Sequence, residues 1–499
     1  MTSEILAQRT DAVVAALTAR PRRSGPAVVN DIHSQLNATR VHRVVDVREL
    51  GGARQAVLAA GEEGRSICIG GGWHAMGGQQ FAEDGVLLDT RRFNQVLAFD
   101  RERGTVEVEA GIQWPELVAR LNALQDDDAA VGLRFPRWAI AQKQTGADRL
   151  SIGGALSANV HGRGLAMRPF VGDIESFTLL DGAGRTLRCA RDENAELFRL
   201  AIGGYGLFGF VATVTLRLVP RRKLRRVVDV LTVDRLMSAF EERTLAGFLY
   251  GDFQFAIDPS SRDFLHRGIF STYEPIADDG PIPSDQRGLT PEQWRGLLLL
   301  AHVDKSRAFD VYATHYLATS GQQYWSDTHQ LSTYLDDYHL AVDEHLLSRG
   351  HASAATEVIT ELYVPPARLN EFLGAVRADF RRHGVEVIYG TIRLIERDDE
   401  SFLPWARDRY TCVIFNLHTA HTPAGLMHSA EAFRRLIDLA IGVGGSYYLT
   451  YHRHARRDQL LACYPGFIEM LRLKRRYDPG ERFQSEWYRW YRKMFRDEL

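Results

Sequence analysis

The sequence predicts an α+β fold, in which short strands and amphipathic helices alternate along the chain. Residues 105–109 and 210–219 alternate apolar and polar side chains with a period of two, which is typical of half-buried strands. Residues 114–124 show helical periodicity, with a proline in the first turn. Glycine-rich segments interrupt this pattern only in the first half, so we expect two regions of different character.

Composition and charge limit the possible partners. The chain has 499 residues, of which 45% are hydrophobic and 25% charged, so two or three globular domains are expected. Lys and Arg number 61 against 63 Asp and Glu, and this balance lacks the basic excess of a nucleic-acid-binding protein. The basic run 221–226 is interpreted as a solvated edge or linker.

Cysteine spacing and hydropathy indicate the cellular setting. Cys68, Cys189, Cys412 and Cys463 lie far apart with no CxxC spacing, which argues against a zinc ribbon or a disulfide framework. The most apolar stretch, 296–301, is far shorter than the ~18 residues of a membrane span. We therefore expect a cytoplasmic protein, a monomer or homodimer, that acts on a small molecule without a membrane or nucleic-acid partner.

Changes in composition suggest four parts. Residues 1–26 are expected to form an N-terminal helix and linker, and 27–220 hold the glycine-rich segments. Glycine loops thin out in 221–460, and 461–499 are rich in arginine and aromatic residues. This aromatic tail is either a partner surface or, the interpretation we favour, a segment that docks on its own chain.

Three glycine-rich segments, 70–78, 153–164 and 203–209, indicate a ligand. Glycine clusters let the backbone approach closely and direct several N–H groups at one anion. Three clusters in one region predict an extended, phosphate-bearing ligand. The third contains a G-x-G-x-x-G string, but the predicted order there is helix, glycines, strand, the reverse of a dinucleotide fingerprint. A Rossmann dehydrogenase is therefore not favoured.

The order of GGGWHAMGG, VEAGIQW, SIGGALSANVHGRG and GGYGLFGFVATVTLRLVP resembles the vanillyl-alcohol-oxidase superfamily of PCMH-type flavoproteins, and within it the alditol oxidase and aldonolactone oxidase branch. The resemblance covers 27–220 well and extends weakly to 477–479. It implies FAD bound by a two-subdomain PCMH-type domain at 27–220. It further implies an α/β cap (substrate) domain with an antiparallel sheet at 221–460, and a segment 461–499 that returns to the FAD domain.

The resemblance also implies which residues bind FAD. The first glycine segment would wrap the pyrophosphate, the second would line the isoalloxazine and ribityl chain, and the third would approach the adenine end. The positions carried over are Gly70, Gly71, Gly72, Trp73, His74, Ala75, Met76, Gly77, Gln79, Gly111, Thr145, Gly146, Ser151, Gly153, Gly154, Ser157, Asn159, His161, Gly162, Gly209, Phe210 and Val211.

His74 is the candidate for a covalent link to the cofactor. In this branch a histidine of the first glycine loop is tethered to the flavin, and the resemblance implies the same of His74. Trp73 and Ala75 replace the usual neighbours. The alternative is a loop histidine that is hydrogen-bonded to a phosphate or a carbonyl.

Two segments of the second region resemble elements that face the substrate. Arg393 matches the arginine of a Glu-x-Arg element, whereas Thr391 stands in the glutamate position. On a strand both side chains share one face. The alternative for Arg393 is a surface ion pair with Glu396 or Asp398.

Further along, the segment 447–454 falls where the branch has a His-Trp-x-Lys element, but the lysine is missing. Tyr448, Tyr451, His452 and His454 are the candidates to replace it, with His452 as proton acceptor because the pKa of histidine suits a base. His418, which shares a strand face with Asn416, is the remaining catalytic candidate.

Acidic residues of the second region and the spacing of the histidines allow other interpretations. Glu357 and Glu361 share a strand face, and substrate contact or a salt bridge explains them equally well. No HExxH motif occurs, and the sole H-x-H, at 452–454, has no suitable partners close by apart from Asp458, so no metal is expected.

Together these observations predict an FAD-linked oxidase or dehydrogenase that acts on CH–OH donors. It would oxidise an alcohol group of a sugar-like or polyol substrate by hydride transfer to flavin N5, and the electrons would pass to oxygen or another acceptor. The alternatives are a flavin-dependent reductase or desaturase of the same superfamily and a redox-silent flavin-binding module.

Overall fold

The computed structural model describes residues 25–130, 135–146, 148–278, 280–332, 342–345, 348 and 354–499. The helix expected within residues 1–26 lies almost entirely outside the described residues. The described chain contains helices and mostly antiparallel sheets, so the predicted α+β class is confirmed. None of the described helices is both long and apolar enough to cross a membrane.

The first sheet is small and parallel, in the order β3 (Arg43–Asp46), β5 (Val86–Asp89), β4 (Ile67–Gly70). Helix α2 (Leu50–Glu62) packs on it with an alanine-rich face, which brings the helix axis close to the strands. A separate hairpin of β1 (Ala27–Val29) and β2 (Thr39–Val41) precedes it. Because β4 ends at Gly70, this sheet delivers the first glycine-rich segment.

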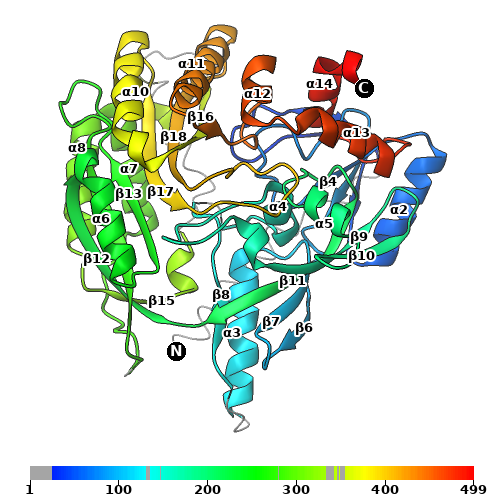
Figure 1. Ribbon diagram of the computed structural model, residues 1–499, viewed down its shortest axis with the longest axis horizontal. Helices are drawn as coiled ribbons and strands as arrows, with labels where there is room; N and C mark the ends of the chain where they lie inside the picture. The colour runs from blue at the N-terminus through cyan, green and yellow to red at the C-terminus, as the bar shows by residue number, and fades with distance from the viewer. Residues whose placement is uncertain are drawn as a thin grey trace.

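The second sheet has the order β10 (Thr186–Ala190), β9 (Ile174–Leu180), β11 (Phe210–Pro220), β7 (Thr105–Glu109), β6 (Val96–Asp100), and β8 (Trp138–Ile140) also pairs with β11. Its helices are α3 (Trp114–Ala130), α4 (Ile152–Ala158) and α5 (Ala195–Ala201). The third glycine-rich segment joins α5 to β11, so the predicted order of helix, glycines and strand is confirmed. Strand β11 crosses the lower part of the molecule and leads to the third sheet (Figure 1).

The third sheet has eight antiparallel strands in the order β15-β12-β14-β13-β17-β18-β16-β19. Helices α6 (Val233–Leu245), α10 (Leu369–His383) and α11 (Pro423–Gly442) pack on it, α6 and α10 through the ring pairs Phe240–Phe270 and Phe380–Phe415. Helices α7 (Pro291–Val303) and α8 (Lys305–Leu317) pack on the same sheet. The strands are β12 (Lys223–Thr232), β13 (Tyr250–Phe255), β14 (Arg267–Ile276), β15 (Gln323–Trp325), β16 (Ala355–Val364), β17 (Val387–Ile395), β18 (Tyr410–Ala420) and β19 (Ser446–Tyr447).

The C-terminal helices return to the first sheet, as the red and blue segments of Figure 1 show. These helices are α12 (Arg457–Cys463), α13 (Phe467–Tyr477) and α14 (Glu486–Met494). Ile67 donates its N–H to the Arg482 carbonyl at 2.6 Å and accepts from the Gln484 N–H at 2.8 Å. Trp487 and Tyr491 are fully buried, which confirms the prediction that the aromatic tail docks on its own chain.

Candidate functional site

A cavity of about 840 Å³ lies between the glycine-rich segments and the eight-stranded sheet. All three glycine-rich segments line it, together with helices α7 and α8. Most of the residues that strands β13, β16, β17 and β18 contribute alternate along the chain, as expected when one face of each strand is turned to the cavity. The alternating residues are Asp252 and Gln254 of β13, Glu357, Ile359 and Glu361 of β16, Tyr389, Thr391 and Arg393 of β17, and Ile414 and Asn416 of β18, and Phe255, Ile388 and Gly390 also reach the lining.

The first glycine-rich segment packs directly against the residues that precede the second. A Cβ atom on Gly71 would lie 2.0 Å from Ser151 Oγ, and one on Gly72 would lie 2.0 Å from the Arg149 carbonyl oxygen. No side chain fits at either position without moving these residues. The next residue, Trp73, has a φ of 61°, in the left-handed region that favours glycine. Its indole is held edge-on by Phe81 and stacked by the Arg91 guanidinium.

His74 follows Trp73 and lines the cavity. Burial lowers the pKa of its imidazole to about 3, and the positive charges of His33 and Arg149 act in the same direction. The ring is therefore neutral at physiological pH, with a lone pair on one of its nitrogens. A neutral imidazole is the nucleophilic form of the side chain.

Two polar atoms near the glycine-rich segments lack a partner among the described residues. Thr145 Oγ1 and Gln79 Oε1 are buried, line the cavity and make no hydrogen bond there. Buried polar atoms in native proteins are almost always paired, so these atoms indicate a polar ligand. A cavity of this size, with glycine backbone and orphaned polar atoms along its wall, fits the extended dinucleotide FAD.

Most positions proposed for FAD line this one cavity. They are Gly71, Gly72, Trp73, His74, Ala75, Met76, Gln79, Thr145, Gly146, Ser151, Gly153, Gly154, Ser157, His161, Gly209, Phe210 and Val211. Gly70, Gly77, Gly111, Asn159 and Gly162 are not part of the lining. Gly111 packs against the Thr90 carbonyl, where a Cβ would lie at 1.8 Å, so its role in the structure is close packing.

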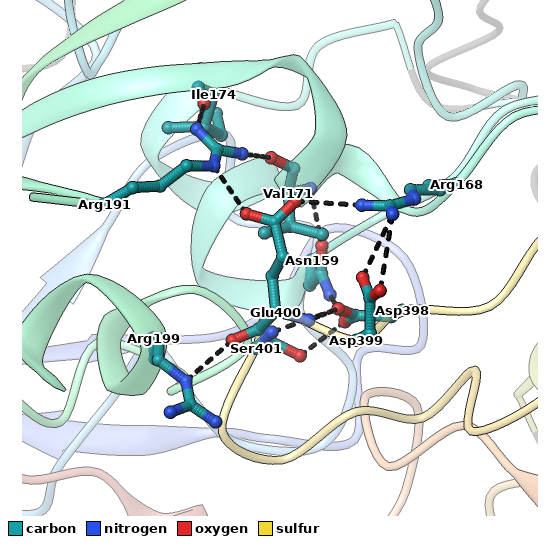
Figure 2. Close-up of polar contacts among 10 residues, drawn as sticks. All are labelled: Asn159, Arg168, Val171, Ile174, Arg191, Arg199, Asp398, Asp399, Glu400 and Ser401. Atoms are coloured by element: carbon teal, nitrogen blue, oxygen red, sulfur yellow. Dashed lines mark hydrogen bonds and ion pairs between the residues drawn. The ribbon is translucent and has the colours of Figure 1, made fainter. Parts of the chain in front are cut away.

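Asn159 instead links the second glycine-rich segment to the loop after β17. It ends α4 with a φ of 48°, accepts the Val171 N–H and donates to Asp398 Oδ2 at 2.9 Å (Figure 2). Asp398 also accepts the N–H groups of Glu400 and Ser401. Around this centre, Arg168 and Arg191 both pair with the Glu400 carboxylate. The contacts fix the end of β17, and hence Arg393, relative to the glycine-rich segments.

Arg393 is 5% exposed and lines the cavity, with its Nε unpaired among the described residues. The alternative of a surface ion pair is wrong, because Glu396 pairs with Arg409 and Asp398 with Asn159. Thr391 faces the cavity beside it, so the prediction that Thr391 and Arg393 share a face is confirmed. The guanidinium is positioned to hold an oxygen atom that gains negative charge.

Glu361 provides the carboxylate that the Thr391 position lacks. Its Oε1 lies 2.6 Å from His161 Nε2, and His161 Nδ1 lies 3.0 Å from the Gly162 carbonyl. Since Nδ1 must donate to that carbonyl, the short contact requires a proton between Nε2 and the carboxylate. The pair is buried, and it joins the second glycine-rich segment to β16.

Tyr451 extends this arrangement. Its hydroxyl lies 3.5 Å from Glu361 Oε2 and accepts a hydrogen bond from Gln144 Nε2 at 3.2 Å. Burial, reinforced by the negative charge of Glu361, holds the pKa of Tyr451 well above its usual value, so its hydroxyl stays protonated. Arg393, Tyr451 and the Glu361–His161 pair therefore form a charged centre at the end of the glycine-lined part of the cavity.

His452 and His418, the other two catalytic candidates, do not line the cavity. His452 stacks on Phe433 with ring centroids 4.4 Å apart, and its Nε2 contacts Thr360 Oγ1 at 3.2 Å. Burial holds the pKa of His452 well below its usual value. His418 lies behind the cavity wall with Glu357 and His302. The structure thus gives both histidines positions that differ from the predicted ones.

Sequence reasoning missed a cationic and aromatic group that lines the cavity. Arg226 donates to the Tyr273 hydroxyl and stacks on the rings of Tyr316 and Tyr324. Arg163 stacks on Tyr273 and donates to the His329 carbonyl at 2.6 Å. These residues come from elements far apart in the sequence. Arg226 belongs to the basic run 221–226, and the interpretation of that run as a solvated edge or linker is wrong for Arg226, which lines the cavity, and for Lys223, which is buried.

Comparisons with known proteins agree with this geometry. A family profile described as an FAD binding domain matches residues 42–190. Residues 42–190 thus form an FAD-binding domain. The charged centre lies where this domain meets the eight-stranded sheet, and the domain's cofactor is FAD.

Three curated relatives are similar to this chain over 150 to 175 residues. An L-gulonolactone oxidase of Mus musculus is 26% identical over 34% of this chain and 36% of its own length. The mitochondrial L-galactono-1,4-lactone dehydrogenase of Brassica oleracea is 31% identical over 30% of this chain and 23% of its own. An uncharacterized oxidoreductase of the fasciation locus of Rhodococcoides fascians is 30% identical over 35% of this chain and 37% of its own. The chain thus spans well under half the length of these relatives.

Proposed function

We propose that this chain is an FAD-dependent oxidoreductase that oxidises a CH–OH group of a sugar-like lactone or a related polar substrate. The observation that carries the proposal is the charged centre of Arg393, Tyr451 and the Glu361–His161 pair at the end of the glycine-lined cavity. The names of the relatives support lactones as the substrate class. The FAD-binding part would comprise two subdomains, and the eight-stranded sheet would form the substrate-binding cap.

The residues of this chain would divide the reaction between them. Bound FAD supplies the acceptor for the two electrons that leave the carbinol carbon as hydride. The Arg393 guanidinium holds the substrate oxygen and stabilises negative charge as its proton leaves. Glu361 takes that proton, and His161 holds the carboxylate in place. The Tyr451 hydroxyl donates a further hydrogen bond to the same carboxylate.

The other groups on the cavity wall would select the substrate. Arg163 and Arg226, together with the tyrosine hydroxyls beside them, offer several hydrogen-bond donors to ring oxygens and hydroxyl groups. Asp252 and Gln254 of β13 supply acceptors. A site built from such groups rejects apolar molecules, because its buried polar atoms would then stay unpaired. This argues against a reductase or desaturase of apolar substrates.

The test is reduction of the flavin by substrate. Purified protein should show flavin absorbance, and anaerobic addition of a panel of aldonolactones and polyols should bleach it for at least one compound. Arg393→Ala should retain the flavin but bleach at least about 100-fold more slowly. A protein that binds FAD yet is bleached by no lactone or polyol would contradict the proposal and favour the redox-silent alternative.

A further inference from the structure

Behind the cavity wall, two histidines and a glutamate from three different elements meet. His302 comes from α7, Glu357 from β16 and His418 from β18, directly opposite Glu357 in the strand register. Oε1 of Glu357 lies 2.8 Å from His302 Nε2 and 3.5 Å from His418 Nδ1. The candidate ligand atoms all lie within 4.8 Å of one another.

The hydrogen bonds of His302 fix its tautomer. Its Nδ1 lies 2.8 Å from the Leu298 carbonyl, one turn back in α7, and a carbonyl can only accept. The proton of a neutral His302 is therefore on Nδ1, and the lone pair of Nε2 points at the Glu357 carboxylate. Two acceptors cannot lie 2.8 Å apart without a positive charge between them. That charge is either a proton, carried by His302 or by Glu357, or a cation.

The position of His418 favours the cation. Its Nδ1 is buried, lies within 3.5 Å of Glu357 Oε1 and makes no hydrogen bond to the described residues. A proton on His302 would explain its contact with Glu357 but would leave His418 Nδ1 without a bonding partner. A metal ion bonded to all three groups at 2.0–2.2 Å would pair both nitrogens, because tetrahedral ligands at such distances lie roughly 3.4 Å apart. The 3.5 Å contact of His418 matches this spacing, and the 2.8 Å contact of His302 would lengthen when the ion binds.

The surroundings also match those of metal-binding histidines. Such a histidine normally donates its second ring N–H to a carbonyl or carboxylate, as His302 does to Leu298. Lys305, the nearby ammonium on α8, donates to the Ala301 and Val387 carbonyls. The Lys305 ammonium is thus hydrogen-bonded to backbone carbonyl groups. Two imidazoles and one carboxylate are a ligand set that Zn²⁺ and similar ions use.

We propose that His302, Glu357 and His418 bind a divalent transition-metal ion of the Zn²⁺ type, which ties α7 to strands β16 and β18. Helix α7 covers the cavity with Trp294, Leu297 and Leu298, and Glu357 itself reaches the lining. The ion thus fixes one wall of the cavity. This inference is independent of the reaction catalysed.

The test measures metal binding directly. Protein without an affinity tag, carrying its flavin and stripped with a chelator, is titrated with Zn²⁺ by calorimetry, and bound metal is counted by elemental analysis. We expect one ion per chain and a higher thermal midpoint with Zn²⁺ but not with Mg²⁺, since a ligand of the folded state stabilises it. His302→Gln, Glu357→Gln and His418→Gln should each weaken binding at least about tenfold.

A matched control is His266→Gln, because His266 also lies near a carboxylate, Asp234 at 3.7 Å, but on the surface. It should bind Zn²⁺ as the wild type does. Flavin absorbance and the thermal midpoint without metal report whether each variant folds, and His418→Gln is the mildest change because its side chain is 18% exposed. Equal Zn²⁺ binding by the wild type and His418→Gln, or none by the wild type, would overturn the proposal and leave His302–Glu357 as a protonated ion pair.

Discussion

His161 Nε2 and Glu361 Oε1 lie 2.6 Å apart, although 200 positions separate them in the sequence. The contact connects the second glycine-rich segment, at its part after α4, with the central part of β16. A shared proton in this buried contact holds the Glu361 carboxylate in the cavity that Arg393 also lines. The strand that carries Arg393 offers only Thr391 at the position where a carboxylate was expected. The contact therefore joins the cofactor-binding part of the site to the part that would bind substrate.

Glu361→Gln should remove the proton acceptor while keeping the shape of the side chain. We expect kcat to fall about 10²- to 10⁴-fold, because a positioned general base contributes that much. Flavin content and thermal midpoint should change little. Glu371→Gln is the control, since Glu371 forms an exposed pair with Arg368. A Glu361→Gln enzyme with wild-type kcat would assign the base elsewhere.

Arg393→Ala should respond to chemical rescue. The guanidinium lines the same cavity as the proposed base, and its loss leaves a negative oxygen unstabilised in a buried site. Turnover should fall about 100- to 1,000-fold and recover in part when guanidinium is added to the assay. Arg409→Ala removes an exposed arginine paired with Glu396 and should do neither. Failure of rescue together with normal flavin binding would indicate a structural role only.

Asp398→Ala should separate the glycine-rich segment from the loop after β17. The carboxylate accepts hydrogen bonds from Asn159 Nδ2 and two backbone N–H groups, and these buried donors would lose their acceptor (Figure 2). Each unsatisfied buried group costs about 1–3 kcal/mol, so the thermal midpoint should drop clearly. Asp399→Ala, at an exposed ion pair with Arg168, should leave it nearly unchanged. Equal midpoints for the two variants would show that the Asn159–Asp398 contact does not stabilise the fold.

The sequence predicted the local features of this site well. Residues such as Gly71 and Gly72 form a recognisable cluster after a strand, and close backbone approach is a property of the cluster itself. Strand periodicity likewise predicted that Thr391 and Arg393 would share a face. Both features depend only on residues that are close together in the sequence, so they can be predicted without knowing the fold.

The pairing of distant residues could not be predicted in this way. The contacts of Glu361 with His161, and of Glu357 with His302, depend on strand order and on the packing of α7 against the sheet. His452 was predicted as a proton acceptor because several histidines and tyrosines cluster in the segment 447–454. In the structure, α11 places Phe433 against its ring. The segment 447–454 has almost no regular structure, so no periodicity indicated which side chains would face the cavity.

His74→Ala should release the flavin from covalent attachment. Because the pKa of His74 is about 3, its ring is neutral and nucleophilic at the pH of the cell, as formation of a tether requires. Acid precipitation of the wild type should carry the yellow colour into the pellet, whereas the variant should leave it in the supernatant. His42→Ala, at a histidine outside the cavity lining, should behave as the wild type. Flavin in the wild-type supernatant would show that no tether forms.

His452→Phe should make the protein more resistant to acid while leaving catalysis intact. Burial holds the pKa of His452 well below its usual 6.5, so the folded protein keeps this ring neutral while the unfolded chain takes up a proton below pH 6.5. Its contribution to stability is therefore complete above pH 6.5 and is lost as the pH falls below that value. Phenylalanine preserves the stack on Phe433 and does not titrate, so the thermal midpoint should fall less below pH 6.5. Since His452 lies outside the cavity lining, kcat should change by no more than a few fold. A folded His452→Phe variant without turnover would instead show that His452 takes part in catalysis.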